Sequence, residues 1–204
     1  MLVFKLKKMT DMLYEQWDMG KEKSKAVGKT CAYIYLFEIL SETEKIVLKY
    51  ENKKLVGYAG YSKWNSKKHF LRKKFYGILA KILINSPLVK NKQAIDEYNI
   101  IYNKIPEEFD EYFDGEVSIL IVDRKYRRKG YGKELLLKVF ELAREDNMKN
   151  IQILSDDSCN YEIYEKFGCK KIWEVTIPDG EPGRSKEENY IYEKVLKEGE
   201  DREI

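Results

Sequence analysis

Residues 117–123 read Val-Ser-Ile-Leu-Ile-Val-Asp, and residues 127–133 follow as Arg-Arg-Lys-Gly-Tyr-Gly-Lys. The first stretch is β-branched or apolar almost throughout, which is typical of a strand buried on both faces. The second stretch places two glycines in a basic turn, and glycine lets the backbone bend and a ligand approach closely. We therefore expect a strand that runs directly into a ligand-binding turn.

The run from 134 to 147 follows this turn. Its apolar residues recur at helical spacing, and they are Leu135, Leu136, Val139, Phe140 and Ala143. The beginning of a helix presents N–H groups without intrahelical acceptors, together with the positive end of the helix dipole. A strand, a basic turn and a helix in this order predict an anion-binding loop, with phosphate as the expected anion.

Spacing distinguishes between the known phosphate-binding loops. A Walker A loop requires four residues between its glycines and Ser or Thr after the lysine, whereas Glu134 follows the lysine here. A Rossmann fingerprint requires a third Gly or Ala, and Leu135 holds that position. The pattern present is Arg-x-x-Gly-x-Gly, formed by Arg127, Gly130 and Gly132. It resembles the pyrophosphate-binding motif of the GNAT family of acyl-CoA N-acyltransferases.

A second segment supports the resemblance. Residues 159–168 read Cys-Asn-Tyr-Glu-Ile-Tyr-Glu-Lys-Phe-Gly. This resembles the GNAT motif in which a short helix carries a tyrosine a few residues before a glycine. The resemblance is specific over residues 115–175 and loose elsewhere, and Arg124 stands where many family members have proline.

The resemblance implies an α/β (α+β) fold, in which helices flank a mixed, mostly antiparallel central sheet of about six to seven strands. The length of 204 residues suits a single domain over 1–204. Strands are expected at 2–6, 45–51, 54–62, 117–122, 151–154, 169–177 and 189–196. Helices are expected at 8–25, 134–147 and 160–167. Residues 32–40 are apolar all round and suit either a helix or a strand, and the resemblance favours the helix. Gly28 is expected to end the first helix, and a loop at 178–186 and a charged tail at 197–204 complete the chain.

Residues 63–113 separate the predicted hairpin from the central strand, and we interpret them as a helical insertion into the minimal GNAT plan. Residues 63–95 hold nine basic side chains and no acidic one. Apolar residues recur there at helical spacing before Pro87, namely Phe70, Leu71, Phe75, Ile78, Leu79, Ile82 and Leu83. The main interpretation is a helix packed on the sheet with solvated lysines. A substrate-binding lid, or a basic amphipathic surface for an anionic membrane or partner, remains open.

Composition narrows the function classes. The net charge is only +3 although 36% of residues are charged, so there is no global nucleic-acid signature. The three cysteines lack paired metal-ligand spacing, which argues against a disulfide framework or a zinc site. No apolar run is long enough for a spanning helix, and the N-terminus lacks a signal-peptide pattern. We expect a cytoplasmic protein without a metal or nucleic-acid partner, and a membrane partner is expected only under the open interpretation of residues 63–95.

The resemblance implies acetyl-CoA as co-substrate. Its pyrophosphate is expected to meet backbone N–H groups of Arg128, Lys129, Gly130, Tyr131, Gly132 and Lys133. Arg127 adds to the local positive charge. The resemblance further implies that the pantetheine arm pairs with backbone groups of Leu120, Ile121 and Val122. A basic turn that only caps a helix is the alternative.

Acyl transfer from a thioester to an amine also needs a proton for the departing thiolate. We assign this role to Tyr164, because a phenol with a pKa of about 10 is protonated at neutral pH. Ile163 and Phe167 are expected to face the core, which leaves Tyr164 on another face. GNAT enzymes often place a tyrosine here near the coenzyme sulfur. A packing role for Tyr164 remains open, with Tyr161 as the fallback donor. Asn160 is expected either to cap the helix or to bind the coenzyme arm.

Glu116 is the candidate general base, because histone-type acetyltransferases of the superfamily carry a catalytic glutamate at the matching position. A partly buried carboxylate there could have a raised pKa and accept a proton directly or through water. A solvated glutamate at the strand end is the alternative, and Asp114 and Glu111 are rivals. His69 lies in the insertion and carries little weight. Cys159 has no visible histidine partner and is interpreted as a packing residue.

These assignments predict an N-acetyltransferase that transfers an acetyl group to a primary amine by direct attack in a ternary complex. The alternative is a non-catalytic acyl-CoA-binding regulatory or interaction module. The acceptor is a small-molecule or peptide amine. The acidic run 110–116 favours a cationic one, such as an aminoglycoside, a polyamine or a protein amine. The resemblance leaves a homodimer open, since C-terminal strands of this fold often pair between subunits.

Overall fold

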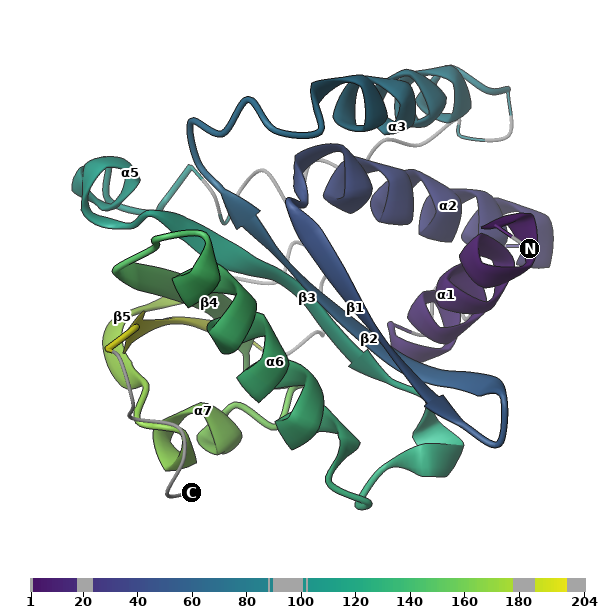
Figure 1. Cartoon of the computed structure of the whole chain (residues 1–204). Coiled ribbons are helices and arrows are strands. Elements are labelled where there is room, and N and C mark those ends of the chain that lie inside the picture. The colour runs from purple at the N-terminus through teal and green to yellow at the C-terminus, as the bar shows by residue number, and fades with distance from the viewer. Residues whose placement is uncertain are drawn as a thin grey trace. The chain divides into compact units, whose positions relative to one another are not determined.

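The computed structural model describes residues 2–17, 24–87, 89, 101, 103–177 and 186–197 (Figure 1). The chain divides into two compact units, one of residues 1–91 and 118–142 and the other of residues 92–117 and 143–204. Strand β3 (Gly115–Val122) contributes residues to both units. That the two units form a single domain over 1–204 stays a prediction.

The sheet confirms the predicted fold class. Its strands follow the hydrogen-bonded order β1-β2-β3-β4-β6-β5. The remaining strands are β1 (Lys45–Glu51), β2 (Lys54–Lys63), β4 (Asn150–Asp156), β5 (Lys170–Ile177) and β6 (Glu187–Val195). The pairs β1–β2, β4–β6 and β5–β6 are antiparallel, whereas β3 and β4 run parallel. Six of the seven predicted strands are therefore present in the described part of the chain.

Close packing explains a glycine of β2. A Cβ atom on Gly57 would lie 2.9 Å from the Ile121 carbonyl oxygen and 3.0 Å from Leu135 Cδ1. Only glycine fits this approach to β3 without a shift of the backbone. Burial along β3 alternates, because Ile119 and Ile121 are buried whereas Leu120 is half-buried. The prediction that this strand is buried on both faces is therefore correct for one face only.

The N-terminal segment corrects the prediction of a strand at 2–6. These residues begin helix α1 (Leu2–Gln16). Phe4 is exposed, while Met9, Met12 and Leu13 are buried. Residues 2–6 become helical although they look like a strand locally. The apolar residues that follow at helical spacing pack against the core, and the helix that they form extends back over residues 2–6.

Helix α2 (Lys25–Glu42) confirms the helix expected at 32–40 but begins inside the helix expected at 8–25. Ser24 caps it by accepting a hydrogen bond from the Val27 N–H at 3.4 Å. Gly28 does not end a helix, since it is buried within α2. Met19, the predicted loop from 178 to 185 and the tail from 198 onward lie outside the described residues.

Helix α3 (Phe70–Ile84) confirms a helix in the insertion and ends before Pro87. It packs along α2 rather than on the sheet (Figure 1). Its buried residues are Tyr76 and Ala80. Five of the seven apolar residues singled out there are exposed instead, namely Phe70, Leu71, Phe75, Ile78 and Ile82. Residues 90–100 of the predicted insertion lie outside the described residues.

The remaining helices position the candidate site. They are α5 (Glu108–Tyr112), α6 (Tyr131–Glu145) and α7 (Glu162–Lys166). Helix α6 begins at Tyr131 rather than Glu134, because the Glu134 N–H already donates to the Gly130 carbonyl at 3.0 Å. All five apolar residues predicted for its buried face are at most 1% exposed.

Candidate functional site

Asp123 fixes the end of β3. Its side chain accepts hydrogen bonds from Lys8 Nζ at 2.7 Å and from the Lys125 N–H at 3.0 Å. Its own N–H donates to the Val56 carbonyl at 2.9 Å. Burial alone would raise the pKa of Asp123. The hydrogen bonds from Lys8 and Lys125 lower the pKa by more than burial raises it, so the pKa lies below its ordinary value. Sequence reasoning did not single out this residue, although an aspartate directly after a buried strand is a recognisable turn signal.

The basic loop after Asp123 has an unusual backbone. A short 3₁₀ turn spans Arg124–Tyr126, and then Arg128 and Gly130 adopt left-handed conformations with φ of 62° and 80°. In the described part of the chain, no atom other than those of Gly130 and its two chain neighbours lies within 4 Å of a Cβ position built on Gly130. The chain thus reverses into the first turn of α6, whose N–H groups have no intrahelical acceptors. Such a turn, open on its outer side, can receive an anion.

The Arg127 side chain folds back onto the protein. Its Nε donates to the Val122 carbonyl at 3.3 Å, and its Nη2 donates to the side-chain oxygen of Gln16. Arg124 Nη2 also donates to the main-chain carbonyl of Gln16, at 3.2 Å. Both arginines therefore fasten the loop to the end of α1, and a direct contact of Arg127 with the coenzyme stays a prediction.

A carboxylate from the β1–β2 hairpin holds the other side of the loop. Glu51 Oε1 accepts hydrogen bonds from Lys129 Nζ at 3.0 Å and from the Tyr131 hydroxyl. These two donors lower the pKa of Glu51, and the bond to Glu51 raises the pKa of Tyr131 to about 12. Lys49 pairs with Glu134 and lies 4.8 Å from the centroid of the Tyr131 ring. Two of the predicted loop residues, Lys129 and Tyr131, are therefore tied to the β1–β2 hairpin.

Glu116 is buried at the start of β3, in the second unit. It is 8% exposed, and its Oε2 accepts a hydrogen bond from Gln152 Nε2 at 3.3 Å. The alternative of a solvated strand-end glutamate is therefore wrong. The rivals are placed differently, since Asp114 is half-buried and accepts from the Lys149 N–H, and Glu111 is exposed. Glu116 is the best shielded of the three carboxylates.

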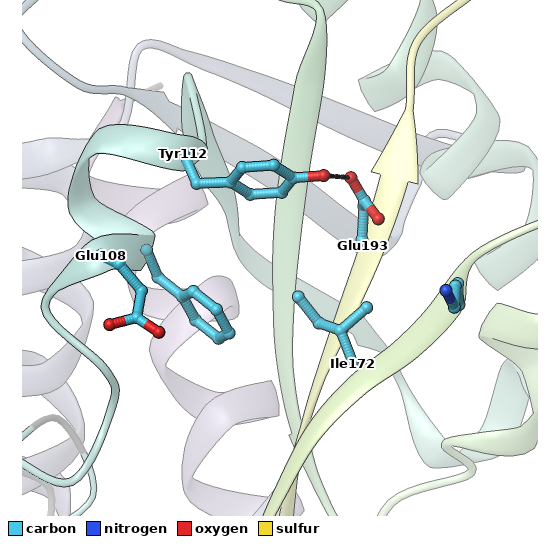
Figure 2. A pocket seen from close by; sticks show the side chains of 6 residues that line it. Glu108, Tyr112, Ile172 and Glu193 are labelled. Atoms are coloured by element: carbon cyan, nitrogen blue, oxygen red, sulfur yellow. Dashed lines mark hydrogen bonds between the residues drawn. The ribbon is translucent and has the colours of Figure 1, made fainter.

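A pocket of about 340 Å³ lies between α5 and strands β5 and β6 of the second unit (Figure 2). Its lining consists of Glu108, Phe109, Tyr112, Lys170, Ile172 and Glu193. The Tyr112 hydroxyl donates to Glu193, which raises the pKa of Tyr112 (Figure 2). Glu193 faces Gln152 across β4 and β6, and Gln152 faces Glu116 across β3 and β4. The pocket and Glu116 are therefore on the same face of this part of the sheet.

Tyr164 is buried, contrary to the expectation that it turns away from the core. It is 9% exposed and packs on Tyr192 with ring centroids 5.4 Å apart. Burial raises the pKa of the Tyr164 phenol above its ordinary value, so the hydroxyl stays protonated at neutral pH. Phe167 is buried as expected, while Ile163 is only half-buried. A single turn of helix is too short for spacing alone to decide its buried side.

Tyr164 and Glu116 approach the sheet of the second unit from opposite faces. Tyr192, which Tyr164 contacts, immediately precedes Glu193 on β6. Successive side chains of a strand point to opposite faces. Because Glu193 shares its face with Glu116, Tyr192 and Tyr164 belong to the other face.

The residues before α7 have structural roles. The residue that precedes the helix is Tyr161 rather than Asn160, and it makes no capping side-chain bond; it packs on Tyr190 with ring centroids 4.7 Å apart. A contact of Asn160 with the coenzyme arm stays a prediction. Burial raises the pKa of Cys159 to about 11, so its thiol stays protonated, as suits a packing residue. Among the described residues, no group of three His, Cys, Asp or Glu side chains is arranged to hold a metal ion.

Comparisons with known proteins agree with the sequence motifs. Residues 97–169 match the family model described as the acetyltransferase (GNAT) family. The GNAT resemblance is confirmed. Smu.2055 from Streptococcus mutans UA159 superposes with a TM-score of 0.57 at 16% identity, over 97% of this chain and 97% of that chain. No curated protein matches the sequence.

Two further solved structures are similar. One, a protein of the GNAT family from Desulfovibrio desulfuricans, has a TM-score of 0.50 and 11% identity over 93% of this chain and 94% of that chain. The other is a GNAT family acetyltransferase from Elizabethkingia anophelis with acetyl-CoA bound, with a TM-score of 0.48 and 13% identity over 79% and 81%. The likeness to the Streptococcus mutans and Desulfovibrio desulfuricans structures shows the fold, and the family match supports acyl transfer in general.

Proposed function

We propose that this chain is a GNAT-type N-acetyltransferase that moves an acetyl group from acetyl-CoA to a primary amine by direct attack in a ternary complex. The loop of residues 127–133 carries the proposal. It joins a buried strand to a 15-residue helix, and Gly130 stands there with φ of 80° and open space around its Cβ position. Arg127, Arg128 and Lys129 are exposed around it. These features suit the pyrophosphate of acetyl-CoA, bound by N–H groups and positive charge.

The backbone end of β3 would hold the next part of the coenzyme. Leu120 and Val122 are half-buried and Ile121 is buried, so their main chain rather than their side chains is the part suited to a ligand. The family resemblance gives these residues to the pantetheine arm, which we retain in the proposal. Asp123 and Arg127 then position the loop relative to this strand end.

Glu116 and Tyr164 are proposed as general base and general acid. The amine nitrogen loses a proton to Glu116, directly or through water, and then attacks the thioester carbonyl carbon. A C–N bond forms, the C–S bond breaks, and the thiolate takes the phenolic proton of Tyr164. The second proton of the attacking nitrogen is released to water, and water restores the Tyr164 phenol. Nitrogen and sulfur are bonded to the same carbon in the tetrahedral intermediate, and Glu116 and Tyr164 lie on opposite faces of the sheet. The two roles are therefore tested separately.

The pocket beside Glu193 supports a cationic acceptor. It offers two carboxylates, Glu108 and Glu193, and the rings of Phe109 and Tyr112, against one positive side chain, Lys170. Carboxylates and aromatic faces both attract a cation. We propose that a positively charged part of the acceptor binds there, on the same face as Glu116.

Release of free thiol from acetyl-CoA in the presence of polyamine, aminoglycoside and peptide amines tests the reaction. Glu116→Gln should lower kcat by about 10²–10⁴, most strongly at low pH, where deprotonating the amine is hardest. Tyr164→Phe should lower kcat without changing acetyl-CoA affinity. Glu174→Gln, which alters an exposed carboxylate of β5, is the control.

Two outcomes would count against the assignments. An unaltered pH–rate profile in Glu116→Gln would remove that residue from the base role, and an unchanged kcat in Tyr164→Phe would remove the proposed acid. Binding of acetyl-CoA without turnover of any amine would favour the non-catalytic module instead.

A further inference from the structure

Helix α3 presents a stripe of large apolar side chains to solvent. The stripe, called the α3 apolar face below, consists of Phe70, Leu71, Phe75, Ile78 and Ile82. Their exposed fractions run from 48% for Ile78 to 81% for Leu71. Leu71, Phe75, Ile78 and Ile82 are spaced four, three and four apart, which aligns them on one side of the helix. A contiguous exposed apolar stripe of this kind is typical of an interaction surface.

Contacts on the opposite side of α3 fix its rotation. Tyr76 packs on Phe37 of α2 with ring centroids 5.8 Å apart. Arg72 Nη2 donates to the carbonyl oxygens of Thr43 at 2.6 Å and Glu44 at 2.8 Å. Lys73 Nζ pairs with the buried Glu44 carboxylate at 2.9 Å. Turning the α3 apolar face inward would break these bonds and leave Glu44 buried without its partner, so the outward orientation is built in.

The charged side chains of α3 and of the segment before it are all positive. Residues 63–87 contain no acidic side chain. Lys67, Lys74 and Lys81 are exposed, and Lys74 Nζ lies 5.8 Å from the Phe70 ring centroid. On the helix, Lys74 and Lys81 are seven residues apart and flank one edge of the stripe. Apolar side chains bordered by lysines suit an anionic lipid surface, because the apolar side chains can contact the acyl chains while the lysines contact the phosphates.

We propose that the α3 apolar face docks the protein on the surface of an anionic lipid bilayer. The aliphatic and aromatic side chains enter the headgroup region, and Lys74 and Lys81 meet lipid phosphates. Among the described residues, no helix is long and apolar enough to cross a membrane. The proposal takes up the basic amphipathic surface for an anionic membrane, which is one of the interpretations that the sequence leaves open for residues 63–95.

Co-sedimentation of the full chain with vesicles tests the proposal. We expect binding to phosphatidylcholine vesicles that contain phosphatidylglycerol, weakening as salt is raised, and little binding to phosphatidylcholine alone. The double variant Leu71→Ser with Ile78→Ser should bind about tenfold or more weakly. Val195→Ser, which changes another exposed apolar residue on β6, should bind like the wild type.

A second measurement keeps the test decisive if the double variant folds poorly. Phe75→Trp adds an indole to the stripe, and its emission, taken as the difference from the wild type, should shift to shorter wavelength on anionic vesicles. Absence of binding to anionic vesicles at low salt would overturn the proposal. So would a solution dimer that becomes monomeric in the double variant while vesicle binding is absent, since the stripe would then be an interface between two copies.

Discussion

Helices α3 and α6 invite direct comparison, because each has 15 residues and each is predicted from apolar side chains at helical spacing. In α6 those side chains are the buried ones, down to 0% exposure for Leu136 and Phe140. In α3 most of them face solvent, and the buried positions are Tyr76 and Ala80. The comparison shows that spacing predicts a helix, whereas the elements packed against it decide which side is covered.

The distribution of apolar residues explains the difference. The apolar residues of α6 occupy one side and charged residues the other, so a single orientation buries them all. Helix α3 is apolar on more than one side, and α2, along which it packs, does not cover all of it. The polar contacts of Arg72 and Lys73 then select the side that faces inward.

Matched truncations provide the strongest test of this comparison. Leu136→Ala, in the buried face of α6, should lower the free energy of unfolding by about 2–5 kcal/mol, because it leaves a cavity. Ile82→Ala, in the α3 apolar face, should change it by no more than about 0.5 kcal/mol. Urea denaturation measures both. Equal losses would mean that α3 is covered in solution and would contradict the exposed stripe.

The sequence predicted most of the sheet, the loop at 127–133 and helix α6, because those segments combine strong periodicity with glycine and charge signals. The loop from Arg127 to Lys133 and helix α6 fall where the Arg-x-x-Gly-x-Gly pattern places them. The burial of Glu116 was also within reach, since a partly buried carboxylate at the strand start was one of its two interpretations.

Other features depend on long-range contacts that spacing does not reveal. The first residues of α1 look like a strand locally, and only the core against Met9 and Leu13 makes the helix the better solution. Tyr164 is buried by Tyr192, which lies 28 positions away in the sequence. Asp123 is bound by Lys8, and Glu51 is bound by Lys129 and Tyr131. The sequence gives no reason to expect these pairs.

The two helix starts should respond differently to substitution. Asp123 fastens the turn before α6, whereas His69 precedes α3 without a capping side-chain bond. Asp123→Asn should cost about 1–3 kcal/mol at neutral pH, since it weakens hydrogen bonds to a buried charge. His69→Ala should cost less. Urea denaturation of both variants makes the comparison, and the reverse order would contradict it.

The pH dependence of Asp123 has a defined sign. Its folded-state pKa is lowered, so its contribution is present above the unfolded pKa of about 3.9 and is lost as the pH falls through the folded pKa. The stability difference between wild type and Asp123→Asn should therefore shrink on acidification below that range. If the stability difference between the two proteins stayed constant from pH 7 to below the unfolded pKa, the result would argue against the Lys8 and Lys125 contacts.

Glu51→Gln should have the smallest effect on stability, because the ion pair to Lys129 is near the surface. The pKa of Tyr131, raised to about 12 by Glu51, should fall toward the ordinary value of about 10. A ¹³C-labelled tyrosine titration by NMR would follow this change. Removing a negative charge beside the loop should also strengthen acetyl-CoA binding, and weaker binding would mean that Glu51 positions the loop for the ligand.

The central claim is that the loop before α6 binds the coenzyme, and thermal unfolding with and without acetyl-CoA tests it most directly. At about 100 times Kd, the ligand should add roughly 2.7 kcal/mol and raise the midpoint by several degrees. Gly130→Val should abolish the shift, because valine is strained at φ of 80° and would enter the open space of the loop. Gly77→Ala in α3, where the nearest side-chain atom lies 3.7 Å from the new Cβ, should retain it. The absence of any shift with the wild type at millimolar acetyl-CoA would contradict the claim.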